Sequence, residues 1–183
     1  MTTTTIAATT VRLRALVAEI REAVDRGLPP GPTAQLVADL LTPHLGAPDL
    51  LLPEHHEGDP DRYRQHVLHA EPDGGFSLVA LVWLPGQITP IHDHVAWGVT
   101  GVHQGAEYER RYRLVPDGPS ARLVATEDVI TRQGEASAFA PPGDIHRVHN
   151  GGTGTAVSVH VYGADITRLG TSVRRLYRLP ADA

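Results

Sequence analysis

The sequence predicts a mainly β domain, in which a sandwich or barrel of short strands follows two N-terminal α-helices. Apolar residues recur at helical spacing near the N-terminus, whereas from about residue 61 short β-type runs alternate with glycine and proline. No linker divides the β region, and 183 residues are enough for one domain to bury its own core. We therefore expect a single domain over residues 1–183, with a helical part at 1–48 and a β-barrel part at 61–179.

Two helices are expected before the strands. Residues 9–27 and residues 33–45 each place apolar side chains on one helical face, and Pro29-Pro30-Gly31-Pro32 separates them. Faces of this kind usually pack on a sheet. The apolar faces consist of Leu13, Leu16, Val17, Ile20 and Val24 in the first helix and of Leu36, Val37, Leu40 and Leu41 in the second.

The remaining elements are short strands bounded by turn residues. Their β-branched and alternating apolar residues are typical of strands, and the glycine-rich turns between them favour two packed sheets or a closed barrel. The expected strands are Tyr63–His69, Phe76–Leu84, Val95–Val102, Tyr108–Leu114, Ala121–Ile130, Ala136–Ala140, Thr155–Tyr162 and Ser172–Leu179.

Composition excludes several classes of function. A formal net charge of -5 argues against a general nucleic-acid binder, because no basic stripe is available to neutralise phosphates. No apolar run approaches the roughly 20 residues of a membrane span, and the N-terminus lacks the pattern of a secretion signal, so we expect a cytoplasmic protein. The absence of cysteine excludes disulfides, thiolate metal ligands and a cysteine nucleophile. The 11 histidines make imidazole the obvious metal ligand.

A pair of histidines two residues apart is the first sign of a metal site. His92 and His94 would point to the same face of a strand, because side chains alternate along a strand. A third ligand must come from elsewhere in the chain, and the candidate is His146, which follows Pro141-Pro142-Gly143.

Two motifs that surround these histidines resemble those of the cupin family. The family has a double-sheet β-barrel of the jelly-roll type with the metal inside, and the resemblance covers about residues 61–162. Most metal-binding cupins add a glutamate to the three histidines, but Gly98 stands at its place and Glu107 comes too late to replace it. The motif residues are Gly86, His92, His94 and Gly105 in the first motif and Pro141, Gly143, His146 and Asn150 in the second.

The missing glutamate has a consequence for charge. Three neutral imidazoles would leave the full charge on a divalent metal, which favours an anionic ligand such as a thiolate. Imidazole donors also accept zinc, copper or nickel, so the ligand set alone does not name the metal.

Ser158, His160 and Tyr162 alternate along one expected strand and could form a hydrogen-bonded row beside the metal. With His92-Asp93-His94, Gly98 and His146, this row resembles the thiol dioxygenases, the family of cysteine dioxygenase and 3-mercaptopropionate dioxygenase. The resemblance implies Fe(II), a thiolate substrate and transfer of both atoms of O2 to sulfur, which gives a sulfinic acid. It also implies that Tyr162 steers the reactants while His160 and Ser158 orient it. Mammalian members crosslink a cysteine to the tyrosine; this chain has no cysteine, which points to the bacterial branch.

The choice of thiol depends on what meets the substrate carboxylate. Cysteine dioxygenases carry an arginine two positions after a tyrosine. Here the residue two positions after Tyr63 is Gln65, which resembles the 3-mercaptopropionate dioxygenases. Strand alternation should point the neighbouring Arg64 to the opposite face. The resemblance implies a compensating arginine from the C-terminal segment; Arg168 is the first candidate, with Arg174 and Arg175 as alternatives.

These observations favour an iron-dependent thiol dioxygenase that acts on a small thiol carboxylate, 3-mercaptopropionate first, with O2. The alternatives are a cysteine dioxygenase, another metal-dependent cupin enzyme, or a non-catalytic cupin binding module. Gly98 counts against other cupin enzymes, which usually retain the glutamate, and the Ser158-His160-Tyr162 row is unexpected in a binding module. We expect no nucleic-acid or membrane partner, and the oligomeric state stays open.

Overall fold

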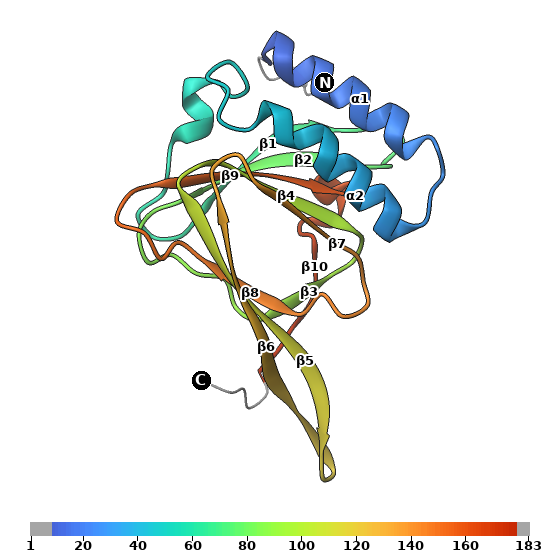
Figure 1. Cartoon of the computed structure of the whole chain (residues 1–183), viewed down its shortest axis with the longest axis vertical. Helices are drawn as coiled ribbons and strands as arrows, with labels where there is room; N and C mark the ends of the chain where they lie inside the picture. Colours follow the sequence, from blue (N-terminus) through green and yellow to red (C-terminus); the bar gives the residue numbers. More distant parts are fainter. Residues whose placement is uncertain (1–8, 179–183) are drawn as a thin grey trace, which may run out of the picture.

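The computed structural model describes residues 9–178 and consists of two facing β-sheets with two long helices on one of them (Figure 1). The prediction of a cupin double-sheet barrel behind two N-terminal helices is confirmed. The elements are α1 (Val11–Val24), α2 (Pro30–Leu41), the 3-10 turns η1 (Thr42–His44) and η2 (Pro53–His56), β1 (Arg64–Ala70), β2 (Ser77–Trp83), β3 (His92–His94), β4 (Gly98–Gln104), β5 (Ala106–Asp117), β6 (Ser120–Arg132), β7 (Ala136–Phe139), β8 (His146–His149), β9 (Ala156–Tyr162), α3 (Ile166–Leu169) and β10 (Val173–Leu176).

Each sheet has five strands and the observed pairings are antiparallel. The first sheet has the order β1-β2-β9-β4-β7 and the second β10-β3-β8-β5-β6. Strands adjacent in space are therefore often distant in sequence, as with β2 and β9. The interior between the two sheets receives residues from both halves of the β region.

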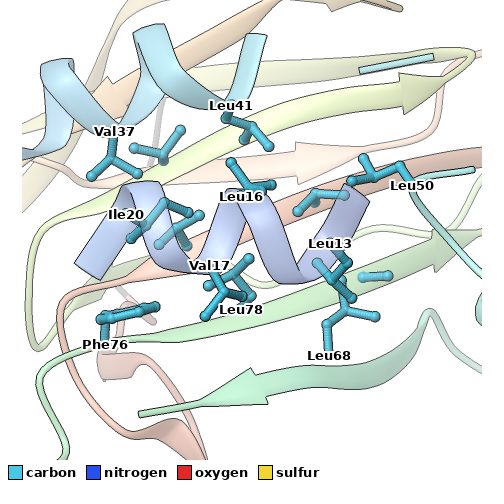
Figure 2. Packing of buried hydrophobic residues seen from close by; sticks show 14 of the residues in the cluster. Leu13, Leu16, Val17, Ile20, Val37, Leu41, Leu50, Leu68, Phe76 and Leu78 are labelled. Carbon is cyan, nitrogen blue, oxygen red and sulfur yellow. The ribbon is translucent and has the colours of Figure 1, made fainter. Parts of the chain in front are cut away.

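The two helices cover the outer face of the first sheet (Figure 2). Helix α1 begins after Thr10, whose side chain accepts a hydrogen bond from the Leu13 backbone N–H. Leu16 and Ile20 of α1 are fully buried against Val37 of α2 and Leu78 of β2. This apolar layer anchors the sheet from outside, while the inner face combines apolar and polar side chains.

Helix α2 begins earlier than the sequence indicates. The expected separator contributes Pro30, Gly31 and Pro32 to the first turn of α2. Proline fits there because the first N–H groups of a helix have no partner within the helix, and its fixed φ suits the helix start. The helix also ends earlier, at Leu41, where the chain continues into η1.

Two short strands were not among the expected ones, and both carry predicted metal ligands. β3 and β8 are three and four residues long, and their polar sequences show no apolar alternation. The expected strand at Val95–Val102 begins only at Gly98. Strands β5 and β6 are longer than expected and form a hairpin that extends away from the barrel (Figure 1). The last strand ends at Leu176, and the expected end at Leu179 lies outside the described residues.

Within residues 9–178, no helix has both the length and the apolar character to cross a membrane.

Candidate metal centre

Three buried histidines meet between β3 and β8 of the second sheet. His92 and His94 point the same way from β3, and His92 is paired in register with His146 of β8. The candidate ligand atoms of the three residues all lie within 4.8 Å of one another. The structure therefore brings together the three metal ligands that the sequence indicates.

The Nδ1 atom of each of the three imidazoles lies within hydrogen-bond distance of an oxygen acceptor of the protein. His92 Nδ1 lies 2.9 Å from the Pro90 carbonyl oxygen, His94 Nδ1 lies 3.0 Å from Asp144 Oδ2, and His146 Nδ1 lies 2.7 Å from Glu109 Oε1. Acceptors at all three Nδ1 atoms favour the tautomer in which Nδ1 carries the proton and the lone pair of Nε2 is free.

The Nε2 atoms meet the requirements of a metal site. His146 Nε2 is buried and has no hydrogen-bond partner, which is costly unless an ion binds there. Three converging imidazole nitrogens with oriented Nδ1–H groups are a usual arrangement for a divalent transition metal. The residues present therefore fit a metal cofactor.

Burial keeps His92 and His94 neutral. It lowers the pKa of His92 to about 3, and the nearby His146 and His94 add to the effect. The pKa of His94 is lowered for the same reason, although Asp144 opposes the shift. Neutral imidazole is the form that binds a metal.

The acceptors are ionised, which adds negative charge behind the ligands. Burial alone would raise the pKa of Glu109, but hydrogen bonds from His146 and Arg111 lower it to about 2. The pKa of Asp144 is lowered in the same way, because hydrogen bonds from the side chain and backbone of His94 outweigh its burial. Sequence reasoning missed both carboxylates. They bring negative charge close to the imidazoles through hydrogen bonds and are not among the three candidate metal ligands.

The place of the missing glutamate is filled by an aromatic ring. A Cβ atom built on Gly98 would lie 2.3 Å from Cζ of Phe139, far inside normal contact. The Phe139 ring packs on His94, with 4.4 Å between ring centroids. Phe139 thus occupies the space that a side chain at position 98 would need.

The polar row of β9 lies opposite the metal site. Val157, Val159 and Val161 face the helices, so Ser158, His160 and Tyr162 point into the barrel. His160 Nε2 lies 2.8 Å from Ser158 Oγ, and the Tyr162 hydroxyl lies 3.1 Å from His160 Nδ1. Burial raises the pKa of Tyr162, so the phenol keeps its proton.

The row continues to a residue that sequence reasoning set aside. Glu107 of β5 is 3% exposed, and its Oε1 accepts a 2.5 Å hydrogen bond from Ser158 Oγ. Glu107 is too far along the chain to replace the missing metal ligand, and it joins the Ser158–His160 chain instead. Glu107 and Glu109 alternate along β5, so the sequence indicates that they share a face, but not that this face is the interior one.

A cavity of about 50 Å³ joins the histidines to the β9 row. Gln65 lies at its wall, while Arg64 points away and its Nη1 lies 3.4 Å from Glu57 Oε2. The residues that line it are Tyr63, Gln65, Leu81, Trp83, Thr89, His92, His94, Thr100, Phe139, His146, Val148, His160, Tyr162, Thr171, Ser172 and Val173.

The candidate arginines lie in two different places. Arg168 is not brought to the cavity: its guanidinium lies 3.0 Å from the Pro72 carbonyl oxygen and 3.0 Å from Asp165 Oδ2. Arg174 and Arg175 line a second, wider pocket of about 440 Å³ that shares Tyr63, Thr89, His92, Thr171 and Val173 with the first. Arg175 is bound to Asp93, between the two ligands of β3, whereas Arg174 has no ion pair with any residue in 9–178.

The barrel with three inward histidines defines a metal-binding cupin. A family model described as cysteine dioxygenase type I matches residues 2–170, so the chain belongs to the cysteine dioxygenase type I family. Membership indicates an oxidoreductase with thiol dioxygenase activity, which uses a thiol and O2.

Several solved structures are similar to parts of this chain. TT1209 from Thermus thermophilus is 20% identical with a TM-score of 0.45, and the match covers 61% of this chain and 91% of that one. A cupin superfamily protein from Desulfitobacterium hafniense is 12% identical with a TM-score of 0.46, covering 67% and 96%. An oxalate oxidase in complex with the substrate analogue glycolate is 19% identical with a TM-score of 0.42, covering 58% and 53%.

Proposed function

We propose that this protein is an Fe(II)-dependent dioxygenase that converts 3-mercaptopropionate to its sulfinic acid. The observation that carries the choice of substrate is the neutral Gln65 at the cavity wall, where cysteine dioxygenases carry an arginine. Cysteine is the alternative substrate.

The overall reaction balances without a further reductant. One thiol and one O2 give one sulfinic acid, and sulfur supplies all the electrons that dioxygen takes up. Fe(II) held by His92, His94 and His146 would supply the redox chemistry that lets dioxygen react with a thiolate.

The protein's own residues then bind and orient the substrate. The cavity at the histidines is small, which fits a short thiol chain better than a bulky one. Tyr162 keeps its proton and holds a hydroxyl at the cavity wall, next to His94, with 5.9 Å between the two ring centroids. Tyr162 therefore supplies a hydrogen-bonding group where the sulfur would lie.

The substrate carboxylate would lie toward the mouth. Gln65 can donate hydrogen bonds from its amide but carries no charge. Arg174, at the wider pocket beside Tyr63 and His92, is the arginine that stays available for an anion, since Arg168 and Arg175 already bind other groups. We assign the carboxylate to Gln65 and Arg174.

Substrate preference tests this assignment. Oxygen uptake is measured with 3-mercaptopropionate, cysteine and cysteamine, and kcat/KM is compared in wild type, Gln65→Arg and the matched control Arg64→Gln. We expect Gln65→Arg to shift preference toward cysteine, and Arg64→Gln to leave it unchanged because Arg64 points away from the cavity. Wild-type preference for cysteine would contradict the choice of substrate.

The metal is tested separately. Metal-free protein is reconstituted with Fe(II), Zn(II), Ni(II) or Cu(II), and oxygen uptake is followed with each thiol. We expect uptake only with Fe(II). If the iron-loaded protein oxidises none of the thiols, the proposed function is wrong.

A further inference from the structure

A buried carboxylate lies at the far end of the Tyr162–His160–Ser158 chain. Glu107 comes from β5 in the opposite sheet, and its Oε1 atom faces two groups of β9. Ser158 Oγ lies 2.5 Å from it and His160 Nε2 lies 3.4 Å from it. An ionised carboxylate accepts hydrogen bonds and cannot donate them, so both groups would direct protons toward Glu107.

The partners of Ser158 determine the direction of the next hydrogen bond. A hydroxyl has one proton to donate and two lone pairs that accept. Trp83 Nε1 can only donate, at 3.1 Å, and takes one lone pair; Glu107 takes the proton. The remaining lone pair faces His160 Nε2, which must therefore carry a proton.

The protonation of Nε2 leaves Nδ1 of a neutral His160 as an acceptor. Two hydroxyls face this atom, Tyr162 at 3.1 Å and Thr100 at 3.2 Å. Nδ1 has one lone pair and accepts from one of them; the phenol is the more acidic donor. A Tyr162 hydroxyl that donates to His160 keeps its oxygen lone pairs for the cavity and for Ser172.

We infer that Glu107 is a positioning residue that holds His160 as the Nε2–H tautomer, which leaves Nδ1 to accept the proton that Tyr162 donates. The catalytic consequence rests on the proposed function. When the Tyr162 oxygen accepts a proton from the thiol, the original phenol proton can move to His160 Nδ1. The resulting imidazolium would be paired with Glu107, so the chain is built to take a proton from the cavity.

The tautomer can be measured directly in the metal-free protein. Long-range 1H–15N correlation spectra distinguish the two neutral tautomers of each imidazole, and His160 is assigned by its absence from the spectrum of His160→Gln. In wild type we expect the Nε2–H form. In Glu107→Leu the Ser158 hydroxyl has lost its acceptor and turns to His160 Nε2, so we expect the Nδ1–H form.

Ser158→Ala is the matched control. It removes the hydroxyl but leaves Glu107 within reach of His160 Nε2, so the Nε2–H form should persist. With iron loaded, Glu107→Leu should lower kcat about ten- to hundred-fold with little change in KM or in metal content.

The wild-type spectrum tests the inference even if Glu107→Leu does not fold. An Nδ1–H form in wild type contradicts it, as does an Nε2–H form that persists in Glu107→Leu. If the tautomers are as expected but no thiol is oxidised, the proposed function fails while the assignment of Glu107 stands.

Discussion

Replacement of Glu109 by glutamine would test how much the carboxylate behind His146 contributes to metal binding. Glu109 Oε1 accepts a 2.7 Å hydrogen bond from His146 Nδ1 in a buried setting. A hydrogen bond to a charged group contributes about 1.5–3 kcal/mol, and a neutral acceptor gives about half of that. Glu109→Gln keeps an acceptor oxygen but removes the charge, so it should cost about 0.8–1.5 kcal/mol.

This cost should appear mainly in the metal-loaded protein. A cation bound to Nε2 of His146 makes Nδ1–H a stronger donor. The hydrogen bond to the Glu109 carboxylate therefore stabilises the metal-loaded protein more than the metal-free protein. We expect the dissociation constant for Zn(II) to rise roughly four- to twelve-fold. The measurement is competition between metal-free protein and a chromophoric chelator at fixed pH and ionic strength.

Glu127→Gln is the control for this experiment. Glu127 binds the other side of the same Arg111, at 3.0 Å, but is more than half exposed and does not contact His146. Its replacement should leave the affinity unchanged. Equal Zn(II) affinity in wild type and Glu109→Gln would refute the reasoning.

Three further substitutions, one of them with a control variant, probe the packing and the chemistry. Gly98→Ala should lower the free energy of unfolding by about 1–3 kcal/mol in denaturant titrations, because the new methyl group meets Phe139. Leu16→Ala should lower it by about 2–5 kcal/mol by opening a cavity under α1, whereas Val11→Ala, at a site 74% exposed, should change it by less than about 0.5 kcal/mol. Tyr162→Phe should lower kcat about ten- to hundred-fold at unchanged iron content, measured by oxygen uptake and metal analysis.

Each of these has a clear contrary result. A fully stable Gly98→Ala protein would mean that Phe139 moves aside freely. Equal effects of Leu16→Ala and Val11→Ala would contradict the packing of α1 on the sheet. Wild-type activity in Tyr162→Phe would remove the phenol from the proposed chemistry.

The sequence was sufficient for the residues whose spacing follows a strand. His92 and His94, or Ser158, His160 and Tyr162, share a face because side chains alternate, and no tertiary information is needed to see it. His146 could be predicted as a metal ligand only from its motif, because a lone histidine after a turn shows no strand periodicity.

The carboxylates that hydrogen-bond to these residues could not be predicted from the sequence in the same way. In Ala106-Glu107-Tyr108-Glu109 the usual pattern would bury the tyrosine and expose the glutamates. The barrel interior reverses this, because Ser158 and His146 offer the carboxylates hydrogen-bond donors that compensate for burial. Such compensation arises between strands that are distant in sequence.

The candidate arginines show a second limit. Arg168 and Arg174 are close in sequence, yet a turn at Gly170, with φ of 80°, separates them. The helix α3 holds Arg168 near Pro72, while β10 carries Arg174 along the mouth of the barrel. Side-chain type and spacing do not encode this change of direction.

The contact between Gly98 and Phe139 also constrains how such a site could change during evolution. The ring that packs on His94 occupies the volume that a fourth ligand at position 98 would require. A glutamate or cysteine introduced at position 98 alone would displace the ring, and loss of the ring alone would leave a void beside His94. The two positions, on paired strands β4 and β7, are therefore expected to change together in relatives, and neither single step is a neutral route between three ligands and four.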